Sequence, residues 1–262
     1  SRSEPEETMT SISPQTRRLV APLLLGLALL ALWTALAGVA SPVLLPGPVQ
    51  VLARFWSDLL TGALWPYLAV TLAEALGGCL IGAAVALPLS VAIHRSAWFS
   101  DAVQPFLGAT QAIPAVALAP LLVLWIGYGL LPVVLLCALI VFFPILVAAV
   151  VGLRMVPREV VDAARLDGAG SLGLLRHVEA PLALPSLLGG FKNGFALSVT
   201  GAVVGEMVMG GSGLGTVLTV QRDAVDTTGM FATIAWLCVI AATAYSLITW
   251  WERRSAIVEA LT

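Results

Sequence analysis

Residues 130–153 read LLPVVLLCALIVFFPILVAAVVGL, a run of twenty-four residues without a charged side chain. A helix needs about twenty mostly apolar residues to cross the hydrocarbon core of a bilayer. Backbone groups left unpaired in hydrocarbon are costly, so a run of this kind must bond its backbone internally, as a helix does. The stretch therefore predicts a transmembrane helix.

The composition of the whole chain agrees with this prediction. Of its 262 residues, 59% are hydrophobic and 11% are charged, whereas about a quarter of the residues in a soluble domain are charged. The mean hydropathy is +0.99, and Lys192 is the one lysine in the sequence. The formal net charge of −2 gives no support for nucleic-acid binding. The apolar surplus must face lipid or other spanning helices.

The three cysteines, Cys79, Cys137 and Cys238, lie far apart, each inside an apolar run. Their spacing is not that of metal ligands. We interpret all three as small buried hydrophobic residues and expect no metal site.

Five further windows are apolar enough, or nearly so, to span the membrane. They cover residues 19–39, 64–93, 113–126, 186–209 and 230–251. The window at 113–126 is short and contains Pro114 and Pro120, so we expect a kinked or partly re-entrant segment there. The sequence thus predicts an all-α integral membrane protein with about six transmembrane helices.

Two segments before the second window differ from the spans. Residues 1–16 are polar, acidic and rich in serine and threonine, which indicates a disordered tail before a single transmembrane domain at 17–262. Residues 48–63 place apolar side chains on one helical face, opposite Arg54 and Asp58, which predicts a helix lying flat in the external membrane interface. A short helix packed on neighbouring loops is the alternative. The apolar face consists of Val51, Leu52, Phe55, Trp56, Leu59 and Leu60.

The distribution of basic residues predicts the orientation, because short loops rich in Lys and Arg stay in the cytoplasm. With six spans and a cytoplasmic N-terminus, only Arg54 and Arg222 fall outside. A five-span arrangement would instead place Arg253 and Arg254 outside. Both termini, including the tail at 1–16, are therefore expected in the cytoplasm. The basic residues on that side are Arg2, Arg17, Arg18, Arg95, Arg154, Arg158, Arg165, Arg176, Lys192, Arg253 and Arg254.

The longest cytoplasmic loop, residues 154–185, reads with the residue before it LRMVPREVVDAARLDGAGSLGLLRHVEAPLALP. Pro157 suits a helix start, and Gly168 and Gly170 interrupt that helix. Ser171 can cap a second helix, which Pro181 would stop. The first helix carries a small apolar face, and a face of this kind at the cytoplasmic boundary needs a partner. It is formed by Val160, Val161, Ala163, Ala164, Leu166 and Ala169.

The run EVVDAARLDGA at 159–169, followed by APLALP at 180–185, resembles the EAA coupling loop of type I, binding-protein-dependent ABC importer permeases. The shared features are an acidic residue, paired alanines, a glycine and a Leu-Pro about seventeen residues later. Further stretches are similar to the nitrate, sulfonate and taurine branch of that family. They are residues 105–129, 142–145, 205–207 and 213–215.

The resemblance implies a type I ABC importer permease-like bundle, with a cytoplasmic coupling helix that docks into a groove of a separate ATPase. It also implies that Pro185 starts the next span. The residues that would couple to the ATPase are Glu159, Asp162, Ala163, Ala164, Arg165, Gly168, Ala169 and Leu172.

The resemblance further implies an importer with two ATPase subunits, a second permease expected to be an identical copy, and an external solute-binding protein, in a bacterial plasma membrane. ATP and Mg²⁺ would bind to the ATPase subunits, because this chain has no Gly-rich loop ending in Gly-Lys-Ser or Gly-Lys-Thr. We expect no cofactor and no catalysis in this chain. The implied cargo is a small solute such as a sulfonate, nitrate or similar anion. Glu74 and Gln111 depart from the family pattern, and a heterocyclic solute is also compatible.

Two carboxylates lie well inside the apolar windows, Glu74 and Glu206, where an acidic side chain costs about 2.5 kcal/mol or more to insert. Glu206, beside Met207, either lines the solute pathway or pins the glycine-rich turn at 210–215; the many free backbone donors of that turn favour the structural role. Glu74 either lines the pathway or is held by polar partners. A secondary transporter driven by both carboxylates is the alternative function.

Gly210-Gly-Ser-Gly213 matches the GxSG of rhomboid-type serine proteases. The histidines His94 and His177 fall on the other side of the membrane from Ser212, so we do not expect a protease. Three pairs of glycines four residues apart suit close helix crossing, within the chain more than between two copies. They are Gly78 with Gly82, Gly190 with Gly194, and Gly201 with Gly205.

Overall fold

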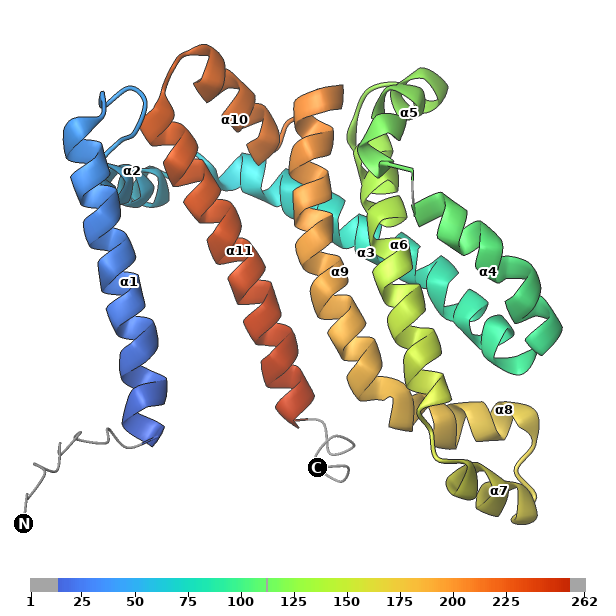
Figure 1. The fold of residues 1–262 in the computed structure, drawn as a ribbon. Coiled ribbons are helices and arrows are strands. Elements are labelled where there is room, and N and C mark those ends of the chain that lie inside the picture. Colours follow the sequence, from blue (N-terminus) through green and yellow to red (C-terminus); the bar gives the residue numbers. More distant parts are fainter. Residues whose placement is uncertain (1–13, 112, 255–262) are drawn as a thin grey trace, which may run out of the picture.

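The computed structural model describes residues 14–111 and 113–254, and all regular structure within these ranges is helical (Figure 1). Of the predicted tail at 1–16, residues 1–13 lie outside the described ranges, and residues 14–16 form the first turn of a helix. The helices are α1 (Pro14–Val39), α2 (Pro48–Thr61), α3 (Trp65–Arg95), α4 (Ala97–Gln111), η1 (Ala115–Leu118), α5 (Ala119–Ile126), α6 (Leu130–Arg154), α7 (Arg158–Leu166), α8 (Ser171–Leu174), η2 (Leu175–Glu179), α9 (Ala180–Met209), α10 (Leu214–Asp223) and α11 (Thr227–Arg254).

Five helical stretches within the described residues are long and apolar enough to cross a membrane. They are Val20–Val39, Trp65–Arg95, Leu130–Arg154, Ser171–Met209 and Thr227–Glu252. The predicted span at 113–126 is broken, as its prolines indicated: Pro114 precedes η1, and Pro120 lies in the first turn of α5. The chain therefore returns across the bundle in pieces, through α4, η1 and α5, before α6 descends (Figure 1).

The core of the bundle is α6, which lies between α3 and α9. Glycines on both neighbours face it: an added Cβ at Gly78 would overlap Cys137, and one at Gly190 would lie 2.4 Å from the Cβ of Ala148. Gly82, Gly194, Gly201 and Gly205 also face α6 side chains or backbone. The prediction of packing within the chain is confirmed. The absent side chains let three helical backbones approach closely.

The amphipathic helix α2 packs against α11, where the rings of Phe55 and Trp236 stack with their centroids 4.6 Å apart. Its exposed apolar side chains, Trp56 among them, suit the predicted interfacial position. One detail of that prediction is wrong, because Asp58 is 6% exposed instead of facing water. Asp58 turns inward and accepts a hydrogen bond from Arg54 at 3.1 Å, and Arg54 also pairs with Asp226 at 3.4 Å.

The outer helices are less covered. None of the residues in the apolar window of α1 is buried. This helix makes few contacts with the rest of the chain, and one of them is the stacking of Trp33 on Phe231. Cys79 and Cys137 are buried as predicted, but Cys238 is exposed because α11 packs through one face only.

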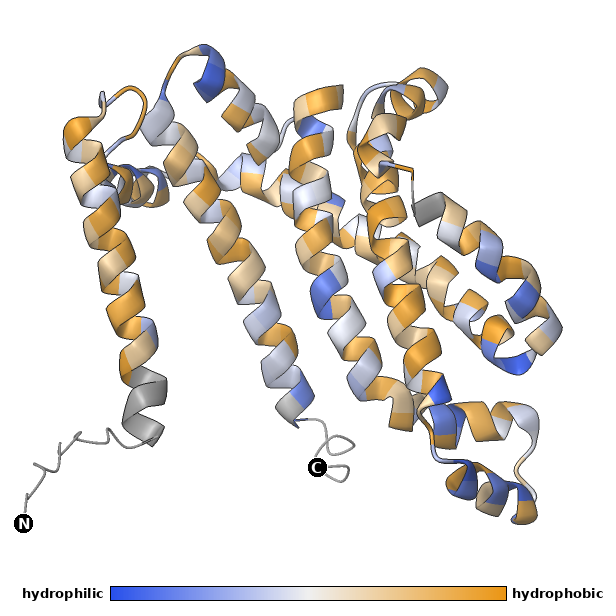
Figure 2. Cartoon of the chain, viewed as in Figure 1, coloured by the Kyte–Doolittle hydropathy of each residue, from blue (hydrophilic) through white to orange (hydrophobic). Residues whose placement is uncertain are grey.

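The two ends of the bundle differ in character. The start of α1, the end of α11 and the segment α7–α8 lie at one end, which we call the hairpin end (Figure 1). Hydrophobic residues run along the long helices, whereas hydrophilic residues gather on α7 and α8 and, at the opposite end, on α10 (Figure 2).

Candidate functional site

The candidate site is the hairpin formed by α7, α8 and η2, which connects α6 to α9. Pro157 is the N-cap of α7, as the sequence predicted. At the other end of α7 the N–H of Ala169 bonds to the carbonyl of Ala164 at 3.0 Å, and the N–H of Gly168 bonds to that of Arg165 at 3.0 Å. These bonds, with Gly168 at φ +87°, form a Schellman cap. The hairpin corner therefore has a defined geometry.

The residues predicted to couple to an ATPase lie on this hairpin, and most of them are exposed. Ala164 and Ala169, which make the capping bond, are partly buried. The exposed ones are Glu159, Asp162, Ala163, Arg165, Gly168 and Leu172. Leu166 is 90% exposed and Leu172 is 76% exposed, although both are large apolar residues. No helix within the described residues covers this face.

Two details of the loop differ from the prediction. Ser171 does not cap α8, because Gly170 occupies the N-cap and no side chain bonds there. Pro181 and Pro185 neither stop nor start a helix: the helical stretch from Ser171 runs on to Met209. Pro181 lies in the first turn of α9, directly after the π-helical segment η2, whose wider turn accommodates a residue without an N–H. The hairpin and the next span are thus one helical stretch, which bends between α8 and α9 (Figure 1).

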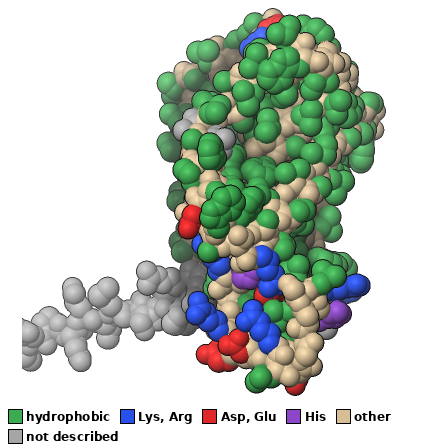
Figure 3. Space-filling model, turned by 90° about the vertical axis from the view of Figure 1, so that its right-hand side faces the viewer, with side chains coloured by type: hydrophobic (Ala, Val, Ile, Leu, Met, Phe, Trp, Pro, Cys, Tyr) green, Lys and Arg blue, Asp and Glu red, His purple; other side chains and the backbone are tan. Residues whose placement is uncertain are grey.

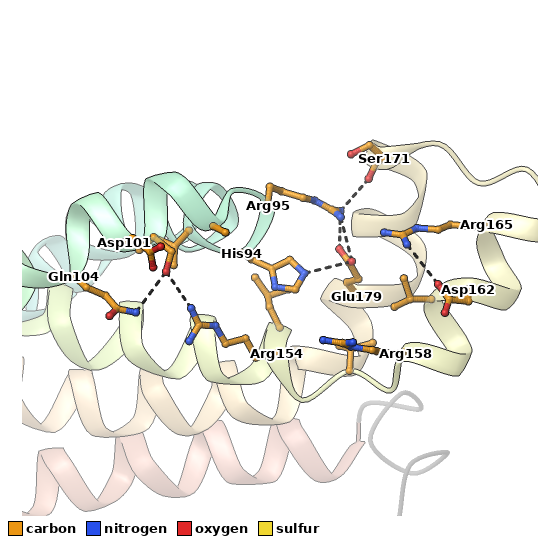
Figure 4. A pocket seen from close by; sticks show the side chains of 16 residues that line it. His94, Arg95, Asp101, Gln104, Arg154, Arg158, Asp162, Arg165, Ser171 and Glu179 are labelled. Atoms are coloured by element: carbon orange, nitrogen blue, oxygen red, sulfur yellow. Dashed lines mark hydrogen bonds and ion pairs between the residues drawn. The ribbon is translucent and has the colours of Figure 1, made fainter.

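A cluster of charged residues that the sequence analysis missed attaches the hairpin to the bundle (Figure 4). Glu179 is 2% exposed, and its carboxylate accepts bonds from both terminal nitrogens of Arg95, at 2.6 and 3.2 Å. His94 Nε2 lies 3.4 Å from the same carboxylate, and Arg95 also donates to the carbonyl of Ser171 at 3.1 Å. The available signal was a lone carboxylate among apolar neighbours, Val178 and Ala180, just before a span.

Beside this cluster is a cavity of about 1000 Å³ between the α3–α4 corner, the end of α6 and the hairpin. Four arginines line it: Arg95, Arg154, Arg158 and Arg165. Arg154 donates to the hydroxyl of Ser100 at 3.2 Å, and Arg165 pairs with Asp162 at 3.4 Å. Charged side chains gather at this end, below a largely hydrophobic body (Figure 3).

The intramembrane carboxylates lie together near the opposite end of α3 and α9. Glu206 accepts a hydrogen bond from the Thr71 hydroxyl at 2.7 Å and one from the backbone N–H of Gly215. Thr71 in turn accepts from the N–H of Leu214 at 2.9 Å. Glu74 lies within hydrogen-bonding range of Glu206, and its second oxygen has no partner within the described residues. Glu206 thus holds the glycine-rich turn, while Met207 is 41% exposed on the outer surface of α9.

The arrangement excludes the serine protease. His177 precedes the 30-residue helix α9, and Ser212 follows it, so about 45 Å of helix separates the two side chains. His94 bonds to Glu179 at the hairpin end and is equally remote from Ser212. No base among the described histidines reaches this hydroxyl.

Comparison with known proteins agrees with this geometry. The family described as "Binding-protein-dependent transport system inner membrane component" matches residues 78–257. The chain belongs to this family of ABC importer permeases. The predicted family and fold are confirmed.

The chain is 44% identical over 256 residues to the riboflavin transport system permease protein RibX of Chloroflexus aurantiacus, covering 94% of this chain and 95% of that one. It is 33% identical to the formylaminopyrimidine transport permease protein ThiX of Halalkalibacterium halodurans, with 87% and 91% covered. It is 29% identical to the putative aliphatic sulfonates permease SsuC of Bacillus subtilis, with 88% and 85% covered. The predicted sulfonate branch is therefore represented among its relatives.

Among solved structures, the fold matches that of the MetNI methionine ABC transporter in an inward-facing conformation, with a TM-score of 0.66 and 21% identity. The match covers 78% of this chain and 99% of that chain. As an ABC importer permease the chain is an integral membrane protein, and the importers of its relatives imply ATPase and binding-protein partners.

Proposed function

We propose that this permease carries a small solute across the plasma membrane and that the α7–α8 hairpin receives force from a separate ATPase. The observation that carries the proposal is the hairpin itself: capped, exposed, apolar at Leu166 and Leu172, and continuous with the span α9. In this proposal the hairpin end faces the cytoplasm and both termini lie on that side. ATP and Mg²⁺ bind to the ATPase, and the permease chain hydrolyses nothing.

The permease acts with a second copy of itself, and the faces of α6 and α9 that look outward meet at the solute pathway. A groove of about 620 Å³ runs along these two helices. Asn193 lies exposed on α9 at this groove, and a polar side chain there is better placed beside a pathway than in lipid. Phe143 and Pro144 of α6 lie across from it.

For the solute, a planar heterocycle such as a flavin is the better candidate than a small anion. The groove is lined by aromatic, aliphatic and amide side chains, without Lys or Arg. Stacking and a few hydrogen bonds suit a flavin ring, whereas a sulfonate or nitrate calls for a cationic partner. The high identity to a riboflavin permease supports the same class.

The docking claim is tested by purifying the tagged chain from its own membranes in mild detergent and identifying the bound subunits. We expect a nucleotide-binding ATPase in the complex. Leu166→Asp should release it without changing the thermal unfolding of the permease, because Leu166 contacts nothing that would need to repack. Leu44→Asp is the control, a leucine that is also largely exposed (75%) and lies in a turn remote from the hairpin. A complex that never contains an ATPase would favour the secondary transporter driven by Glu74 and Glu206.

The solute is tested separately by measuring uptake into proteoliposomes that contain the purified complex and its external binding protein. Riboflavin should be taken up in an ATP-dependent manner, and taurine should neither be taken up nor compete. Uptake of taurine without uptake of riboflavin would overturn the substrate class and leave the docking claim standing.

A further inference from the structure

The long helices α3 and α9 are joined by polar contacts at both of their ends. At the hairpin end Arg95, the last residue of α3, holds Glu179, which directly precedes α9. Near the opposite end Thr71 and Glu74 of α3 meet Glu206 of α9. Between them the Ser198 hydroxyl donates to the carbonyl of Ala75 at 2.8 Å. We call α3, α9 and these contacts the frame, and both helices also pack on α6.

Within this frame, the contact at the hairpin end has a special position. The side chains of His94 and Arg95 make the polar side-chain contacts that join α7, α8 and η2 to the rest of the described chain. Arg95 bonds to both ends of the segment formed by α8 and η2, namely to the carbonyl of Ser171 and the carboxylate of Glu179. The paired bonds from one guanidinium to one carboxylate fix orientation as well as distance.

The burial of Glu179 makes this contact stiff. Its side chain is 3% exposed, and that of Arg95 is 27% exposed. A buried carboxylate separated from its cation is strongly disfavoured, so small displacements of the hairpin meet a steep restoring force. A surface ion pair would instead exchange with water and transmit little.

We infer that Arg95 and Glu179 form a transmission joint through which movement of the hairpin is passed to α3. The inference rests on the proposed function, since it supposes that an ATPase moves the hairpin. Without the joint, the hairpin still drives α9, because the two form one continuous helix, but α3 no longer follows at the hairpin end. Arg95 and Glu179 are thus positioning residues that make α3 and α9 move as one body.

The experiment uses the purified complex with its ATPase and single environment-sensitive bimane labels, in a Cys238→Ser background. One label is attached at Val85→Cys on α3, where the side chain is 55% exposed, and another at Leu197→Cys on α9, which is 37% exposed and does not line the groove. The joint is removed by the double variant Arg95→Met/Glu179→Leu, which removes both charges of the ion pair and so leaves neither Arg95 nor Glu179 buried without its partner. Arg222→Gln is the control, because Arg222 pairs with its neighbour Asp223 and joins no two helices.

In the wild type and in Arg222→Gln, ATP with vanadate should change the emission of both labels. In the double variant the change at residue 85 should be lost while the change at residue 197 persists. A merely structural role would reduce both together. Persistence of both changes, or loss of both while the ATPase stays bound, would overturn the inference.

A double variant that does not assemble is replaced by Arg95→Leu/Glu179→Met, which also has no side-chain hydrogen bond at the joint and is read in the same way. Absence of an ATPase from the wild-type complex is a different result, because it removes the proposed function and the joint with it.

Discussion

At the scale of single residues, the two intramembrane glutamates have distinct roles although they lie side by side. Glu206 accepts hydrogen bonds from the Thr71 hydroxyl and from the N–H of Gly215. Glu74 lies within hydrogen-bonding range of Glu206. Its other oxygen has no bond within the described residues. Glu206 is therefore the acceptor that holds the glycine-rich turn, whereas Glu74 can be replaced by an amide that supplies a donor toward Glu206.

We predict that Glu206→Gln lowers the free energy of unfolding by about 1–3 kcal/mol, because an amide nitrogen cannot accept the second bond. Glu74→Gln should have little effect, since its NH₂ group supplies a donor toward Glu206. Thermal unfolding in detergent, followed by tryptophan fluorescence, compares the two variants. Equal losses in both would contradict these roles.

At the scale of helical elements, the close packing of α3, α6 and α9 depends on glycines, because glycine has no side chain to hold the backbones apart. Gly189 and Gly190 are neighbours on α9, yet a Cβ at Gly190 would lie 2.4 Å from that of Ala148, and one at Gly189 would meet nothing within 4 Å. We predict that Gly190→Ala destabilises the permease by about 1–3 kcal/mol through overpacking. Gly189→Ala should not lower the unfolding temperature in the same detergent assay, because alanine favours a helix more than glycine does. A large loss from Gly189→Ala instead would mean that another surface covers this side of α9.

The hairpin corner is an element of a different kind, held by backbone geometry. Gly168 has φ +87°, a conformation that costs a residue with a Cβ roughly 1–2 kcal/mol. We predict that Gly168→Ala speeds hydrogen exchange of the amides at 167–169 by about tenfold, because about 1.4 kcal/mol of local stability is lost. Gly173→Ala on α8, where φ is ordinary and nothing lies within 4 Å of the new Cβ, should not change it. Unchanged exchange in Gly168→Ala would show that the cap does not hold the corner.

At the scale of the whole molecule, the sequence predicted the features that the lipid environment requires. Long apolar runs must be helices in lipid, so the spans could be read from hydropathy, and the glycine pairs from the need for close approach. The Arg95–Glu179 pair could not be predicted from the sequence, because the partners are 84 positions apart and only the packing of α3 beside η2 brings them together. Asp58 was missed for a similar reason: its inward turn depends on Arg54 and the nearby Asp226.

The helical stretch from Ser171 to Met209 contains 39 residues, and the 30 residues of α9 within it are roughly 45 Å long. Its first turn lies in the hairpin, and its last turn carries the glutamate that holds the loop before α10. In the proposed importer, a loaded binding protein at the outer end and ATP at the ATPase would each change the affinity for the other by an equal factor, because coupling free energies are reciprocal.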